Sequence, residues 1–397
     1  MVLDNREILL KEKYDVIVVG GGIAGISAAV ASARNNLKTL LIEKSVNLGG
    51  LATSGLISWY EPLCDGKGKK VIGGIAEELI RLSVKYSFDT LPQKWGGDGH
   101  NKSLNDRFST FYSPTVFALS LDEFVLRHNV KIRFDTYAVY PVTERNTCSG
   151  VICESVSGKE YFEARVVIDA TGDASVCHRA GIPTVDGKNF MTYISHFIDI
   201  DGIKECAKDS NMAKLRQWKN NGSDMLGNGQ PKNMEMLSGT SADDVTEYVI
   251  AGKRTMLEYV KKTDRNSYDI MALPQMPQLR TIRRIIGKEN FCAENKKTSQ
   301  SSVGKCSDFR MNKLGMEYSI PYGALYNEKI SNILAAGRII SAPQGDGWEV
   351  ARVIPTCALT GETAGNAAYL MVHDNCENRC VDIEKLRFLQ ERNNIKI

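Results

Sequence analysis

The chain has 397 residues, of which 43% are hydrophobic and 24% are charged, and its formal net charge is +3. These values are typical of a globular protein, and they exclude a disordered, collagen-like or fibrous chain. The 50 basic residues nearly balance the 47 acidic ones, so the charge gives no reason to expect binding to nucleic acid or to an anionic membrane.

Neither the cysteines nor the apolar segments indicate a special class of protein. Ten cysteines are scattered without a CxxC pair, which predicts reduced thiols, a cytoplasmic location and no metal site. The charged first residues lack the apolar region of a signal peptide. Residues 16–33 carry no charge, but their Gly, Ala and Ser content is poorly apolar for a membrane span.

The first strong motif is a glycine-rich turn between two predicted elements. Residues 14–19 form a β-branched run typical of a buried parallel strand. The sequence GGGIAG follows at once, and residues 26–33 then predict a helix of small residues. A second buried strand is predicted at 39–42, and it ends in an acidic residue, Glu43.

Each part of this motif has a physical role in binding a dinucleotide. Gly20 permits the tight turn, Gly22 lets the backbone approach a pyrophosphate, and Gly25 lets the helix pack closely on the strand. The helix N-terminus attracts phosphate groups. Glu43 can accept hydrogen bonds from both hydroxyls of an adenosine ribose. The combination predicts an adenine-dinucleotide site, without choosing between NAD and FAD.

The later segments continue the pattern of strands and glycine-rich turns. A second glycine-rich, hydroxyl-bearing segment, residues 44–55, follows Glu43 directly. Ser113 and Pro114 predict a helix start, with the helix running to about His128. Further strands are predicted at residues 131–139, 149–154, 164–168 and 333–338. The second half of the segment 352–365 predicts the start of a final helix, near Cys357 to Gly361.

Together these segments resemble the FAD-dependent oxidoreductase family of the glutathione-reductase-like superfamily, in its branch with one dinucleotide fold and an inserted substrate domain. The matching motifs, in the family's order, are VIVVGGGIAG, LLIEK…LGG, VVIDATGD, NILAAGR and RVIPTCALTGETAG. They are spread over most of the chain, whereas residues 190–313 match much less clearly.

The resemblance implies an α/β fold, with a Rossmann-like FAD-binding domain that carries a β-meander, plus an inserted α+β substrate-cap domain. The discontinuous FAD-binding domain would consist of residues 1–60, 114–185 and 315–397. The cap would consist of residues 61–113 and 186–314.

By the same resemblance, the cofactor is FAD, most simply bound without a covalent link. Gly20, Gly22, Ala24 and Gly25 would hold the pyrophosphate, and Glu43 the adenosine ribose. The other implied cofactor contacts are Lys44, Gly49, Gly50, Ser54, Ala138, Ala170, Thr171, Gly172, Gly337, Arg338, Arg352, Val353, Thr356 and Cys357. A helix start near Cys357 would stabilise the negative charge of reduced flavin, and a covalent flavin link through that cysteine is the alternative.

Two residues are candidates for catalysis. Residues 190–200 alternate like a strand, and if this strand roofs the flavin, His196 can serve as a base or substrate anchor. The alternative is a hydrogen-bonded histidine inside a sheet. Arg280 stands close to Arg283 and Arg284, and one of these cations can clamp a substrate carboxylate. The alternative is a salt bridge between domains, and a shared face requires a helix here.

We therefore predict an FAD-dependent oxidoreductase that exchanges a hydride between a small-molecule substrate and flavin N5, with an external electron donor or acceptor that the sequence leaves open. No second GxGxxG indicates a separate NAD(P)H domain, and no CxxC indicates a dithiol relay. Three alternatives stay open: a flavin-dependent monooxygenase, a flavoprotein in which FAD is structural or a redox sensor, and a dehydrogenase that uses NAD alone. Tyr60 and Glu61 follow residues 44–55, the flavin-side segment, and can reach a substrate.

Overall fold

The computed structural model describes residues 8, 10–98, 107–292, 300–345 and 347–397. Its central feature is a seven-stranded sheet in the order β5-β2-β1-β8-β7-β6, with β16 also paired to β8. The pairs among β5, β2, β1, β8 and β16 are parallel, and β6, β7 and β8 form an antiparallel meander. The strands are β1 (Leu10–Val19), β2 (Thr39–Ile42), β5 (Lys131–Arg133), β6 (Tyr137–Glu144), β7 (Thr147–Ser155), β8 (Gly158–Asp169) and β16 (Ile333–Ala335).

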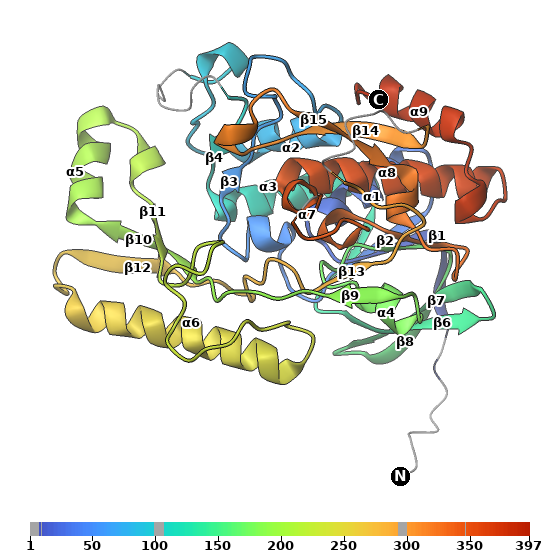
Figure 1. Cartoon of the computed structure of the whole chain (residues 1–397), viewed down its shortest axis with the longest axis horizontal. Helices are drawn as coiled ribbons and strands as arrows, with labels where there is room; N and C mark the ends of the chain where they lie inside the picture. The colour runs from blue at the N-terminus through green and yellow to red at the C-terminus, as the bar shows by residue number, and fades with distance from the viewer. Residues whose placement is uncertain (1–7, 9, 99–106, 293–299, 346) are drawn as a thin grey trace, which may run out of the picture.

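Two helices of small residues pack against each other beside the parallel strands. They are α1 (Ile23–Arg34) and α8 (Ile354–His373), which run across the middle of the molecule in Figure 1. A Cβ at Gly361 would lie 2.1 Å from the carbonyl oxygen of Ala24, and one at Gly365 would lie 2.5 Å from that of Ala28. The two glycines therefore allow the helix backbones to approach closely.

A smaller unit lies to one side of this sheet (Figure 1). It contains a three-stranded sheet in the order β11-β10-β12 and a core of its own that includes Tyr193, Tyr248 and Met256. The strand predicted at residues 190–200 is present but shorter, and it spans Ile194–Asp199. The elements of the smaller unit are β10 (Ile194–Asp199), β11 (Gln217–Asn220), β12 (Tyr268–Ala272), α5 (Ile200–Asp209) and α6 (Ala242–Lys262).

The remaining elements complete the fold. Helix α3 begins at Pro114 with Ser113 as its N-cap, as predicted. The last long helix, α8, begins at Ile354, so the predicted start near Cys357 was three residues late. The other elements are α2 (Ile75–Val84), α3 (Pro114–Arg127), α4 (Ser175–Arg179), α7 (Trp348–Ala351), α9 (Ile383–Arg392), β3 (Trp59–Tyr60), β4 (Thr110–Phe111), β9 (Thr184–Asp186), β13 (Arg283–Ile285), β14 (Ser302–Ser307) and β15 (Glu317–Pro321).

All seven strands of the large sheet come from the three segments that we assign to the FAD-binding domain. Helix α2, from the segment 61–113, nevertheless packs in the main core against α8. The division into an FAD-binding domain and a cap stays a proposal. Within the described ranges, we find no helix whose length and apolar character suit a membrane crossing.

Candidate functional site

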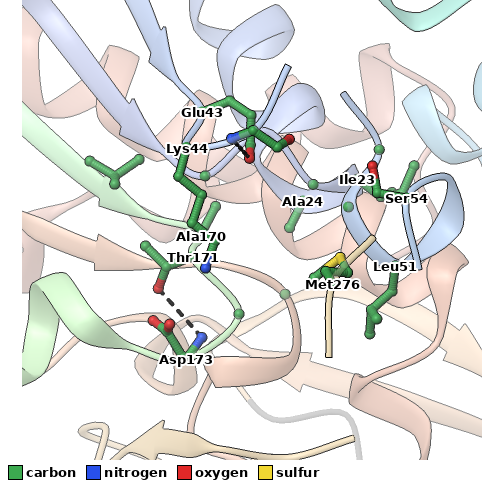
Figure 2. A pocket seen from close by; sticks show the side chains of 18 of the residues that line it. Ile23, Ala24, Glu43, Lys44, Leu51, Ser54, Ala170, Thr171, Asp173 and Met276 are labelled. Atoms are coloured by element: carbon green, nitrogen blue, oxygen red, sulfur yellow. Dashed lines mark hydrogen bonds between the residues drawn. The ribbon is translucent and has the colours of Figure 1, made fainter. Parts of the chain in front are cut away.

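A cavity of about 550 Å³ lies beside the carboxyl ends of β1, β2, β8 and β16. In a parallel α/β sheet this is the edge where ligands bind. Its wall combines the glycine-rich turn after β1, the segment after β2, the turn after β8 and the start of α8. Residues 275–277, from the smaller unit, complete the wall. Figure 2 shows this arrangement, with Lys44 and Asp173 reaching in from different strands.

The glycine-rich turn leaves room for a phosphate group. Gly20 has a φ of +103°, and a Cβ there would lie 2.5 Å from the Ala170 carbonyl oxygen. At Gly25, a Cβ would lie 1.8 Å from the Gly20 carbonyl oxygen, so only glycine permits α1 to start so close to the turn. By contrast, a Cβ at Gly22 would meet no atom within 4 Å, because this residue faces the cavity. The first turn of α1 has no side-chain cap, which suits an anion.

Glu43 both supports the turn and faces the cavity. Its Oε2 accepts a hydrogen bond of 2.7 Å from the Gly21 N–H, and its Oε1 accepts one of 2.8 Å from the Ser45 N–H. Each carboxylate oxygen has a second lone pair, so the group can still accept hydrogen bonds from ribose hydroxyls. The buried carboxylate, the open Gly22 and the uncapped helix together fit the adenosine and pyrophosphate parts of FAD.

A cation and an acid, Lys44 and Asp173, both line the cavity and lie near each other. Burial alone would raise the pKa of Asp173, but the nearby Lys44 ammonium and hydrogen bonds from Ser175 and Thr171 lower that pKa below its ordinary value. Asp173 therefore carries a negative charge at neutral pH. Asp173 was not predicted as a cavity residue, although it directly follows the residues Ala170, Thr171 and Gly172 that were.

Most of the predicted cofactor contacts line this one cavity. Gly25, Val353 and Thr356 do not line it, because Gly25 lies within α1 and the other two are buried at the start of α8. The predicted residues that the structure brings together here are Gly20, Gly22, Ala24, Glu43, Lys44, Gly49, Gly50, Ser54, Ala138, Ala170, Thr171, Gly172, Gly337, Arg338, Arg352 and Cys357.

The segment after β16 joins the turn after β8 to the start of α8. The Arg338 Nε donates a hydrogen bond of 2.7 Å to the Gly172 carbonyl, and the Gly337 N–H donates one of 3.0 Å to Thr360 Oγ1. Cys357 lines the cavity from α8, and burial raises the pKa of its thiol to about 12. A thiol that stays protonated at neutral pH is a poor nucleophile for a covalent flavin link.

His196 lies outside this cavity, on β10 of the smaller unit. Its side chain is buried, with Nε2 3.2 Å from the Leu56 carbonyl oxygen and 3.3 Å from Ser58 Oγ. Burial and the charge of Arg216 lower its pKa to about 4, so the imidazole is neutral at pH 7. This placement favours the alternative of a hydrogen-bonded histidine in a sheet. A catalytic role for His196 stays a prediction.

Arg280 also lies outside the cavity wall, in a segment that is not helical. The backbone N–H of Arg280 donates a hydrogen bond of 2.8 Å to Asn189 Oδ1. Arg283 and Arg284 belong to strand β13, so the three arginines do not share a helix face. Arg283 forms a salt bridge of 3.3 Å with Asp186 on β9, and both residues lie in the segment 186–314, so this ion pair does not join the two proposed domains.

Known proteins place the chain in a family. The sequence profile described as FAD dependent oxidoreductase matches residues 15–389. The thioredoxin reductase of Bacillus subtilis (strain 168) is 30% identical over 80 residues, which are 20% of this chain and 25% of that protein, so the match spans about a quarter of that relative's length.

Two solved structures are similar over 96% of this chain. A geranylgeranyl bacteriochlorophyll reductase-like protein from Thermoplasma acidophilum is 13% identical, with 83% of that chain covered and a TM-score of 0.49. The p-nitrophenol 4-monooxygenase of Pseudomonas putida DLL-E4 is 12% identical, with 81% covered and a TM-score of 0.48. Because the family profile matches nearly the whole chain and the cavity fits the cofactor, the chain belongs to the FAD-dependent oxidoreductase family and its cofactor is FAD.

Proposed function

We propose that this enzyme exchanges a hydride between flavin N5 and a small substrate that carries a negative charge. Bound FAD supplies the two-electron chemistry, while the chain binds the substrate and orients it. The observation that carries this proposal is the shared cavity wall, in which residues 275–277 of the smaller unit face the glycine-rich elements of the large sheet. A substrate held by the smaller unit would thus lie next to the cofactor.

Backbone and side-chain hydrogen bonds fasten this wall to the flavin-side segment. The Gln275 N–H donates a hydrogen bond of 2.8 Å to the Ser54 carbonyl. The Gln278 Nε2 donates to the Gly55 carbonyl at 2.7 Å and to the Ile194 carbonyl at 3.0 Å. One glutamine therefore ties β10 to the flavin-side segment. Met276 projects into the cavity near Leu51, where it offers an apolar surface to a substrate (Figure 2).

The charge preference rests on Arg352. This residue lines the cavity, and its guanidinium lies 4.9 Å from the ring centre of Trp348. Among the residues that the structure describes, neither Arg352 nor Arg280 has a carboxylate within ion-pair distance. The Arg352 Nε is buried without a hydrogen-bond partner. The Arg352 Nη2 donates a hydrogen bond of 3.1 Å to the Met225 Sδ, which is a weak acceptor, and a bidentate carboxylate would satisfy the guanidinium better.

The test uses anaerobic changes of flavin absorbance. Small carboxylates and their neutral amides would be screened in pairs, for bleaching of oxidised enzyme and for reoxidation of dithionite-reduced enzyme. We expect a carboxylate to react while its amide does not, and Arg352→Gln to raise the half-saturating concentration about tenfold or more. Arg216→Gln, whose half-buried guanidinium lies outside the cavity, serves as the matched control.

Other outcomes would support a different function. Equal reactivity of carboxylates and amides would contradict the charge preference. Substrate hydroxylation that consumes oxygen and a reductant would identify a monooxygenase instead. A flavin that no reductant bleaches would indicate a structural role for FAD.

A further inference from the structure

A buried carboxyl group lies directly behind the start of α8. Glu61 follows strand β3, its side chain is 8% exposed, and its Oε2 accepts a hydrogen bond of 3.2 Å from the Ile354 N–H. Ile354 is the first residue of α8 and lines the FAD cavity. Glu61 itself does not line the cavity, so Ile354 is the residue that connects its carboxyl group to the cavity wall.

The first turn of α8 has few N–H groups to share. Ile354 donates to Glu61, Pro355 has no N–H, and the Cys357 N–H donates to the Val353 carbonyl at 2.9 Å. The partial positive charge of this 20-residue helix therefore acts on two groups at once, the Glu61 carboxyl on one side and the cavity on the other.

The other groups around Glu61 keep a constant charge near neutral pH. Tyr60 donates its hydroxyl hydrogen bond to the Ala76 carbonyl and Tyr112 donates to the Ala52 carbonyl, and burial raises both phenol pKa values well above 10. The Cys357 thiol on α8 is neutral, and Arg352 is the neighbouring cation. Burial raises the pKa of Glu61 to about 7, against the opposing effects of backbone N–H groups and Arg352.

We propose that Glu61 takes up a proton when the bound flavin is reduced and releases it when the flavin is reoxidised. Two electrons and one proton convert oxidised FAD into its reduced form with one negative charge. A flavin bound against the α8 terminus would place this charge close to Glu61, where it would disfavour a second negative charge. The carboxylate then binds a second proton from solvent, so two electrons are accompanied by two protons. The inference rests on FAD binding and is independent of the substrate.

The proposal predicts a particular dependence of the flavin midpoint potential on pH. For a two-electron couple, each proton taken up lowers the potential by about 30 mV per pH unit. The slope of the wild-type protein should be about 59 mV per pH unit from the pKa of Glu61 in the oxidised protein up to its higher pKa in the reduced protein. At higher pH the slope should return to about 30 mV per pH unit.

The experiment is a mediator-coupled redox titration of the FAD-loaded full chain from pH 6 to 9. Glu61→Gln should lack the steep segment and show the slope of one proton. Glu362→Gln is the matched control, because Glu362 is also a buried carboxyl group and its pKa is also raised to about 7. Glu362 lies on α8 about 12 Å beyond Ile354 along the helix axis, so this variant should keep the steep segment.

Two results would overturn the proposal. One is a Glu61→Gln protein that keeps the steep segment. The other needs no variant and so applies even if Glu61→Gln fails to fold: a wild-type slope of one proton over the whole pH range. A reduced-minus-oxidised infrared spectrum gives a second readout, since the wild type and Glu362→Gln should gain a protonated carboxyl band that Glu61→Gln lacks. A merely structural hydrogen bond to Ile354 would change neither the slope nor the band.

Discussion

The stability of this protein should depend on pH through Glu362, a fully buried carboxyl group in the middle of α8. Its Oε2 accepts a hydrogen bond of 2.7 Å from the Ile75 N–H, at the start of α2, and its Oε1 accepts one of 3.1 Å from Asn393. Burial raises the pKa of Glu362 from about 4.5 to about 7. We predict that Glu362→Gln removes the loss in the free energy of unfolding that the wild type shows as the pH rises.

The magnitude follows from proton linkage. Between pH 4.5 and 7 the folded protein holds a proton on Glu362 that the unfolded chain has lost, so the stabilising contribution is complete below pH 4.5 and falls as the pH rises through 7. A shift of about 2.5 pKa units corresponds to about 3 kcal/mol. Glutamine is nearly isosteric and does not ionise, so the variant lacks this loss.

The assay is urea unfolding of wild type and Glu362→Gln at a fixed excess of FAD, from pH 5 to 8. We expect the difference in the free energy of unfolding to change by about 2–3 kcal/mol in favour of the variant over this range. A difference that stays constant with pH would refute the reasoning, because it would mean that Glu362 titrates at the same pH in the folded and unfolded protein.

Three further predictions concern the cofactor cavity and its surroundings. Gly25→Ala should weaken FAD binding at least about tenfold and destabilise the fold by about 1–3 kcal/mol, because the new Cβ would meet the Gly20 carbonyl. Fluorescence titration with FAD measures the affinity, and thermal unfolding measures the stability. An unchanged affinity would contradict the packing argument. Glu43→Gln keeps a single acceptor oxygen for two backbone N–H groups and should raise the FAD dissociation constant about tenfold in the same titration, with equal affinity as the contrary result. His196→Asn should leave the shape of the pH profile of anaerobic flavin reduction unchanged between pH 5 and 8, since the imidazole is already neutral there, and a lost or displaced inflection would show that His196 titrates during turnover.

Local sequence patterns are enough to predict the dinucleotide-binding elements. The strand of residues 14–19, the glycine-rich turn and Glu43 lie within thirty residues of one another, and local patterns are sufficient to predict them because each glycine answers a local backbone requirement. The same is true of α3, where Ser113 and Pro114 mark the first turn. Helix α8 begins at Ile354, three residues before the predicted start near Cys357, and the sequence does not mark this start because the N-cap residue Val353 has no side chain that could cap the helix.

Contacts between distant parts of the chain, which only the folded structure shows, bring other residues to the cavity or next to its wall. The Glu61 carboxyl meets the Ile354 N–H across 293 positions of sequence, and residues 275–277 meet the flavin-side segment through a hydrogen bond to Ser54. The same folding places His196 behind that segment and leaves it outside the cavity. Such contacts depend on how the smaller unit packs on the large sheet, and that packing is decided by many long-range side-chain contacts at once. The periodicity of apolar residues along the sequence predicts local elements and cannot predict this packing.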